Sequence, residues 1–335
     1  MERPRDRRRA RLESMASSVT GLTPGVMQPW AQRLFCGWVG RWVRVWHRPQ
    51  FHGLEHLPAD RPFMVVANHS GGGVREVLVL TVAWLQQVRG GPAIAGFAHP
   101  AGFHLQPFKS LMPAVGCVPS SYAGARAARD AGASLLVFPG GDYEAARPFW
   151  EASRIDFGGR KGFLKIAADA RLPIVPLRIH GSHLATPVLW RGGLLLATLF
   201  ITPRYVLGLR RYPVTVSGVG IASALVWWGM SSALGAWGVA LALLWLAMPF
   251  HVAWPALPLT YHFQFGRPIE LSELFEDALD PTGSPPPYGA EGPASSPSDE
   301  VLGRAYARVR AALHDLRIPE DASHSVPGSK KPPAR

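Results

Sequence analysis

Residues 62–80 read PFMVVANHSGGGVREVLVL, and this stretch decides the fold. The apolar run Phe63–Ala67 is short and β-rich, which is typical of a buried strand, and residues 75–88 follow with a helical pattern. Between the two lies a polar turn that contains Asn68, His69 and three glycines. Because a strand that passes through such a turn into a helix is the unit of a parallel sheet, the stretch predicts an α/β domain.

The same alternation of apolar runs and helical patterns continues through residues 49–184. Further strands are predicted at 93–98, 134–138 and 174–179, and further helices at 103–111, 123–131 and 162–171. The expected fold is α/β, a mostly parallel central sheet covered by helices. In such sheets ligands bind beyond the carboxyl ends of the strands. The polar and glycine-rich segments at 68–73 and 139–142 are therefore expected to line a site.

Composition and the N-terminal region favour a lipid surface. Charged residues make up 17% of the chain, tryptophan occurs 12 times and the formal net charge is +12, which together favour a membrane surface over nucleic acid as the partner. Residues 29–48 predict one amphipathic helix at the membrane interface, because Trp30, Trp38, Trp42 and Trp46 share one face with arginines beside it. A helix that packs on its own domain is the alternative. Residues 1–28 are expected to be a disordered basic arm and not a signal peptide.

Residues 216–250 form the most apolar part of the chain. No Lys, Arg, Asp or Glu occurs from Tyr212 to Gly266, so the segment is long enough for one membrane span or for a re-entrant helical hairpin. Arginines on both sides favour an inserted hairpin that returns to the same face, and a buried soluble helix is the alternative. A strand over 259–269 is expected to rejoin the sheet of a domain that spans residues 49–279. Residues 280–298 predict a linker, 299–317 a charged amphipathic helix and 318–335 a disordered tail.

His69 is the candidate general base. If the helix begins near Val74, Glu76 lies in its first turn and can fold back toward the imidazole, where a carboxylate fixes the tautomer and supports the positive charge. A structural histidine is the alternative, since the chain has 12 of them. Cys36 and Cys117 lack metal-ligand spacing, and the sequence contains neither a nucleotide-binding loop nor a serine-elbow motif. No metal and no cofactor are therefore expected.

Several motifs resemble the blocks of the glycerolipid acyltransferase family, typified by 1-acylglycerol-3-phosphate acyltransferases. The resemblance is strongest to its divergent bacterial branch, related to diacylglycerol-forming and lysophospholipid enzymes. It covers roughly residues 50–184 and rests on blocks in matching order and spacing: the lead-in Gly53–Pro58, Asn68-His69-Ser70, Phe138–Gly141, the arginine-lysine stretch 154–163 and Pro173–Pro176.

The chain also departs from the family pattern. Val74 stands where the family has an aspartate, Gly140 where it has a glutamate, and residues 142–144 where an arginine follows. The second-block arginine is also absent near residues 116–119. The family residues in the third block hold the acceptor's phosphate, so these departures leave open a neutral or bulkier acceptor.

The resemblance implies a membrane-associated enzyme that moves a fatty acyl group from an acyl thioester, with acyl-CoA as co-substrate, to a lysophospholipid or acylglycerol hydroxyl. His69 then acts as base and Glu76 orients it, while amides of Gly140 and Gly141 are candidates to hold the oxyanion or the acceptor. The candidate contacts to the donor or to phosphate are Arg147, Arg154, Arg160 and Lys161.

The expected partners are membrane lipid and acyl-CoA, at the cytoplasmic face of the cytoplasmic membrane. The alternative is a catalytically inactive lipid-binding or scaffold protein of the same fold. This alternative is open because the family aspartate is displaced and the third block is altered. Binding to nucleic acid is not expected, since residues 1–15 hold no aromatic side chain on which a base could stack.

Overall fold

The structure, a computed structural model, describes residues 22–70, 73–88, 90–104, 106, 108–192, 211–232, 235–247, 255–276 and 298–318. Its centre is a seven-stranded sheet in the order β1-β9-β6-β2-β5-β3-β4. All neighbouring strands are parallel except β6 and β9. The predicted mostly parallel sheet is therefore confirmed. The strands are β1 (Gln50–His52), β2 (Met64–Ala67), β3 (Ile94–Ala98), β4 (Val118–Pro119), β5 (Ser134–Val137), β6 (Ile174–His180) and β9 (His262–Phe265).

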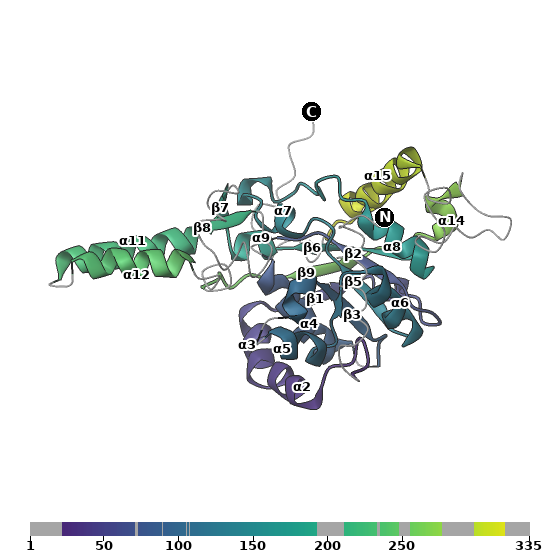
Figure 1. The fold of residues 1–335 in the computed structure, drawn as a ribbon, viewed down its shortest axis with the longest axis horizontal. Helices are drawn as coiled ribbons and strands as arrows, with labels where there is room; N and C mark the ends of the chain where they lie inside the picture. The colour runs from purple at the N-terminus through teal and green to yellow at the C-terminus, as the bar shows by residue number, and fades with distance from the viewer. Residues whose placement is uncertain are drawn as a thin grey trace, which may run out of the picture.

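Side chains alternate between the two faces of the sheet. Helices cover each face (Figure 1). Met64 and Val66 of β2 join the core beneath α6 (Tyr122–Asp130), α8 (Gly162–Ala170) and α15 (Asp299–Asp315). Val65 and Ala67 join the opposite core beneath α4 (Val74–Gln87). Because strands buried on both faces need apolar residues at every position, β2 is a continuous hydrophobic run.

The pairing register brings three chain turns to one edge of the sheet. Met64 of β2 lies opposite Leu135 of β5 and Ile174 of β6, so the segments after Ala67, Val137 and His180 leave the sheet side by side. The remaining short elements are η1 (Leu54–His56), η2 (Pro100–Phe103), α5 (Phe108–Ala114), α7 (Gly141–Ala145), η3 (Phe149–Glu151), α9 (Ser182–Ala185) and α14 (Leu271–Leu274). The predicted helix at 103–111 is thus displaced toward the C-terminus, with a 3₁₀ turn before it.

The predicted single helix over 29–48 is wrong. The chain forms α2 (Pro29–Cys36) and α3 (Trp38–Trp46), because Gly37 leaves the helical region with φ −80° and ψ −115°. The aromatic face is divided as a result: Trp42 packs against the core over α4, whereas Trp38 is 78% exposed.

The prediction of a disordered arm over residues 1–28 is wrong for residues 22–28. Gly25 donates to the carbonyl of Gly116 at 2.9 Å and Gln28 to that of Ala114 at 2.7 Å. These backbone bonds hold residues 22–28 against the domain, because they give the extended segment partners on the turn after α5. Residues 1–21 lie outside the described part of the chain.

The apolar segment forms two helices, α11 (Val216–Ser231) and α12 (Ala236–Ala247), which lie side by side and project away from the sheet (Figure 1). A Cβ added at Gly229 would lie 2.5 Å from the Cα of Gly238, so these glycines let the two backbones approach closely. The alternative of one continuous span is wrong, because the first helix already ends at Ser231. Within the described residues, no helix combines the length and the apolar character needed to cross a membrane.

A two-stranded ribbon carries this helical pair. β7 (Val188–Gly192) pairs antiparallel with β8 (Tyr212–Thr215), and α11 begins at the next residue, where the Thr215 hydroxyl accepts from the amide of Gly218 at 2.9 Å. The C-terminal helix α15 agrees closely with its prediction and is capped by Ser298. Most of the predicted linker, residues 280–297, and the predicted tail from residue 319 onward lie outside the described residues.

Candidate active site

His69 and Glu76 meet at the carboxyl edge of the sheet. The Nδ1 atom of His69 is in hydrogen-bond contact with Glu76 Oε1, and the same carboxylate oxygen accepts the amide of Ser70 at 2.8 Å. Glu76 lies in the first turn of α4, as predicted, and is fully buried, whereas the His69 side chain is 13% exposed. The carboxylate is therefore held from several sides while one edge of the imidazole remains open to a substrate.

Neighbouring side chains hold this pair in place. The Asn68 amide bonds both backbone groups of Ile179 on β6, donating at 3.1 Å and accepting at 2.7 Å. The Ser70 hydroxyl contacts the second oxygen of Glu76 and also the hydroxyl of Ser182 on α9. These bonds tie the turn after β2 to the end of β6. The sequence predicted no role for Ser70, beyond its place in the Asn68-His69-Ser70 block, and none for Ser182, since isolated serines carry no distinctive pattern.

The outer face of the imidazole is bounded by Phe138 and Gly73. The ring of Phe138 stacks on that of His69, with centroids 4.4 Å apart and planes inclined by 28°. Gly73 has a φ of +84°, and a Cβ added there would lie 2.7 Å from Nε2 of His69. Glycine is therefore required at this position for its backbone conformation and for the space beside Nε2.

Glu144 on α7 links the two glycine-rich turns. Its Oε2 accepts the backbone amide of His69 at 3.0 Å, and its Oε1 accepts that of Asp156 at 3.1 Å. A Cβ at Gly140 would collide with Oε2 of Glu144, so the Glu144 carboxylate fills the space that a side chain at 140 would need. Burial raises the pKa of Glu144 to about 7, although Arg147 and the two amides act in the opposite direction.

The predicted contacts to donor and phosphate divide into two groups, the first of which lies at α7 and the turn that precedes it. Arg147 is buried, pairs with Glu144 at 3.4 Å and has Nη2 at 2.7 Å from Nε2 of His183. Burial lowers the pKa of both Arg147 and His183. Arg160 donates to the Gly140 carbonyl and to Asp142, each at 2.6 Å. Arg160 therefore braces the turn whose amides are the predicted oxyanion donors.

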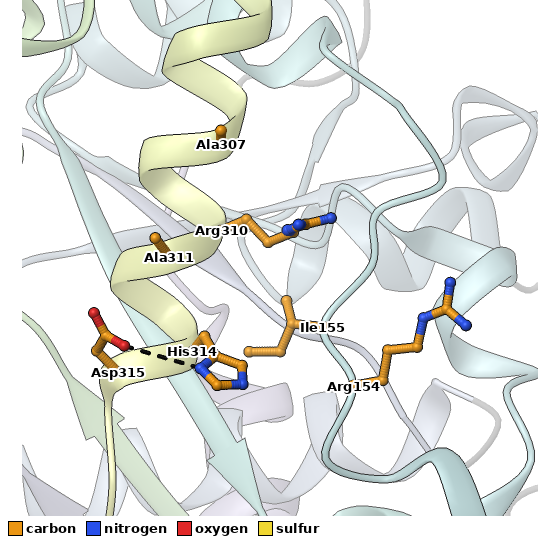
Figure 2. Close-up of a pocket in the computed structure, with 7 residues that line it drawn as sticks. All are labelled: Arg154, Ile155, Ala307, Arg310, Ala311, His314 and Asp315. Atoms are coloured by element: carbon orange, nitrogen blue, oxygen red, sulfur yellow. Dashed lines mark ion pairs between the residues drawn. The ribbon is translucent and has the colours of Figure 1, made fainter.

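The second group lies toward α15. Arg154 pairs with Asp156 at 2.8 Å and lines a groove of about 410 Å³ together with Arg310 and His314 of α15 (Figure 2). Lys161 donates to the carbonyl of Asp299 at the start of the same helix, at 3.0 Å. These two side chains are not brought to the imidazole, and their predicted roles stay predictions.

The turn at 140–141 is tightly constrained. Gly141 has a φ of +46°, and its amide donates to the Phe138 carbonyl at 3.1 Å. A Cβ at Gly141 would lie 2.7 Å from Nη1 of Arg160. Of the two predicted oxyanion donors, the Gly141 amide is thus already used within the turn. In the described part of the chain, no cluster of three or more His, Cys, Asp or Glu side chains is arranged to hold a metal ion.

The chain is similar to a known protein family and to several curated proteins. Residues 48–180 match the model of the family described as Acyltransferase. An uncharacterized protein of Mycobacterium tuberculosis is 30% identical over 170 residues, which cover 51% of this chain and 45% of that protein. A protein of Gallus gallus named "DGAT1/2-independent enzyme synthesizing storage lipids" is 29% identical over 134 residues, 40% of this chain and 39% of its own length.

The match thus spans less than half the length of these curated relatives. Among solved structures, the 1-acyl-sn-glycerophosphate acyltransferase PlsC of Thermotoga maritima superposes with a TM-score of 0.42 at 15% identity, over 87% of this chain and 80% of that one. The family that the sequence motifs predicted agrees with the family model.

Proposed function

We propose that this protein transfers a fatty acyl group from acyl-CoA to the hydroxyl of a lipid such as a lysophospholipid or an acylglycerol. The match of residues 48–180 to the family model described as Acyltransferase supports this proposal. The observation that carries the proposal is the contact between Glu76 and Nδ1 of His69 at the carboxyl edge of the parallel sheet. The name of the Gallus gallus relative, which refers to storage-lipid synthesis, supports a glycerolipid acceptor.

The proposed step is direct transfer. Nε2 of His69 takes the proton of the acceptor hydroxyl as its oxygen attacks the thioester carbonyl, and Glu76 stabilises the imidazolium that forms. The tetrahedral intermediate then collapses, the carbon–sulfur bond breaks, and the leaving thiolate takes the proton back from His69. The products are the acylated lipid and free coenzyme A, and the enzyme returns to its starting state.

The developing oxyanion needs donors, and the turn after β5 supports that role. Because the amide of Gly141 donates to Phe138, we assign the amide of Gly140 as the principal donor. Arg160 holds the Gly140 carbonyl at 2.6 Å and so keeps the turn rigid. Loss of one such donor typically lowers a rate by about 10²–10³.

The proposed setting is the cytoplasmic face of the cytoplasmic membrane. Large apolar side chains gather on the projecting helical pair, where Trp227 is 73%, Met230 77% and Trp237 67% exposed to solvent. A helix that is apolar on every side is not stable as a solvated element. We therefore propose that α11 and α12 insert into the interfacial region of the bilayer, together with Trp30 and Trp38, and deliver the active site to lipid substrates.

An acceptor panel tests the proposed function. Purified full-length protein in detergent is given radiolabelled long-chain acyl-CoA together with lysophosphatidate, lysophosphatidylcholine, monoacylglycerol or diacylglycerol, each in a separate reaction. We expect labelled product with at least one of these acceptors. Absence of product with all of them would contradict the proposal and would favour the lipid-binding reading of the same fold.

A further inference from the structure

Two arginines from outside the family-matched region lie against Tyr143 of α7. The guanidinium carbon of Arg191, on β7, is 4.4 Å from the centroid of the Tyr143 ring, and that of Arg211, just before β8, is 4.7 Å from it. Tyr143 directly precedes Glu144, whose carboxylate holds the backbone amide of His69. The β7–β8 ribbon therefore brings two positive charges to α7, the helix whose Glu144 contacts the candidate base.

These charges exceed their local counter-charge. Asp142 pairs with Arg160 at 2.6 Å and lies 3.9 Å from Arg211. Arg191 has no ion pair with a carboxylate among the described residues, and its Nε atom is buried without a hydrogen-bond partner. Asp156, which accepts the Tyr143 hydroxyl at 3.4 Å, is already paired with Arg154 at 2.8 Å. Asp142 is thus the carboxylate left to balance Arg160, Arg191 and Arg211. Because like charges held together are unfavourable, such an arrangement is typical of a site that receives an anion.

The ligand that best matches this surplus is a phosphate group. Guanidinium groups bind phosphate oxygens through paired N–H donors, and the aromatic ring of Tyr143 fixes the orientation of two of them. A phosphate monoester carries about −1.5 to −2 charges at neutral pH, which suits an excess of two positive charges. The segment 142–144 itself contains no arginine. The positive charge beside it is supplied by Arg191 and Arg211 of the β7–β8 ribbon.

We propose that Arg191 and Arg211, with Arg160, form a subsite for a phosphate group of the substrate beside the His69–Glu76 pair. This proposal rests on the proposed acyl transfer and deepens it. The phosphate belongs either to a phosphate-bearing acceptor, such as lysophosphatidate, or to the coenzyme A portion of the donor. Since Arg211 lies at the base of the helical pair proposed to enter the bilayer, the subsite sits near the level of lipid headgroups.

Equilibrium binding tests the subsite without turnover. The protein carries His69→Ala, so no acyl transfer takes place, and the dissociation constants of coenzyme A, pantetheine, short-chain lysophosphatidate and the matching monoacylglycerol are measured. Adding Arg191→Gln or Arg211→Gln is expected to raise the dissociation constant of at least one phosphate-bearing ligand about tenfold or more. Pantetheine and monoacylglycerol, which lack the phosphate, are expected to bind unchanged.

Matched variants separate charge from folding. Arg61→Gln removes an exposed arginine that pairs with Glu270 near the opposite edge of the sheet, and it is expected to leave all four constants unchanged. Arg191→Lys keeps the positive charge but lacks the paired N–H donors, so it is expected to restore only part of the affinity lost in Arg191→Gln.

A change confined to coenzyme A would assign the subsite to the donor, and a change confined to lysophosphatidate would assign it to the acceptor. Unchanged affinity for both phosphate-bearing ligands in the Arg191→Gln and Arg211→Gln proteins would overturn the proposal. Because these constants need no catalysis, that result stands apart from failure of the acceptor panel, which concerns acyl transfer itself.

Discussion

The Oε2 atom of Glu144 accepts the backbone amide of His69 at 3.0 Å. This bond joins the turn after β2, which holds the candidate base, to the turn after β5, which holds the candidate oxyanion donors. The geometry of the base therefore depends on an acid that contacts its main chain, in addition to Glu76, which contacts its ring.

The burial of Glu144 predicts a specific pH dependence of stability. Its pKa rises from the usual 4.5 to about 7 in the folded protein, so folding favours the protonated acid. The stabilising contribution is complete below pH 4.5 and is lost as the pH rises through 7. The compared quantity is the difference in the free energy of unfolding between the wild-type protein and Glu144→Gln. We expect this difference to fall by about 1–3 kcal/mol as the pH rises across this range. Denaturant unfolding of both proteins at several pH values measures this difference. A difference that does not change with pH would contradict the raised pKa of Glu144.

Glu76→Gln should impair catalysis more than folding. The amide can still accept one hydrogen bond, but it cannot stabilise an imidazolium, so we expect kcat to fall by about 10²–10⁴. The control is Glu55→Gln, which changes an exposed acid on η1. Steady-state kinetics on the preferred acceptor measures the effect. A kcat in Glu76→Gln equal to that of the control would remove Glu76 from its orienting role.

Gly73→Ala tests the space beside Nε2 of His69. The substitution adds a Cβ 2.7 Å from that atom and strains a residue with φ of +84°, so we expect loss of both stability and activity. Gly90→Ala is the matched control, because Gly90 has φ of +71° but no atom lies within 4 Å of a Cβ added there. Both variants should lose about 1 kcal/mol or more of stability. Only Gly73→Ala should also lose most of its kcat, and equal activity in the two variants would contradict the account.

Exposed side chains at the end of the helical pair should govern membrane binding. Replacing Trp227 and Trp237 by Glu places two charges on the surface that is proposed to enter the bilayer, and we expect a strong reduction in sedimentation with anionic phospholipid vesicles. The control is Trp150→Glu, which alters a tryptophan of η3 that is 62% exposed and lies outside the pair. If the double variant sediments as well as this control, the helical pair does not mediate docking.

Much of the sheet and its helices could be predicted from local patterns. The runs at 63–67, 93–98, 134–138 and 174–179 correspond to β2, β3, β5 and β6, because strands buried on both faces need consecutive apolar residues. The pairing of Glu76 with His69 also followed from spacing, since an acid in the first turn of α4 is close to the end of β2. Local sequence is sufficient where the partners lie within a few residues of each other.

Other features depend on contacts that no local pattern encodes. The break at Gly37 separates two halves of one continuous amphipathic stripe, and the stripe itself shows no interruption. Arg191 and Arg211 reach Tyr143 only because an antiparallel ribbon folds back over α7. Glu144 did leave a signal: a glycine at 140 with an acid four residues later allows the carboxylate to occupy the vacant side-chain position.

The central claim is that His69 is the base that drives acyl transfer, and one comparison tests it most directly. The rate of acyl transfer from acyl-CoA to the preferred acceptor is measured for the wild-type protein, for His69→Ala and for His56→Ala. His56 bonds the carbonyl of Phe265 at 3.1 Å, on β9, which is separated from β2 by strand β6. The account predicts that transfer falls by at least 10² in His69→Ala and is unchanged in His56→Ala. Transfer that persists at the wild-type rate in His69→Ala would contradict it.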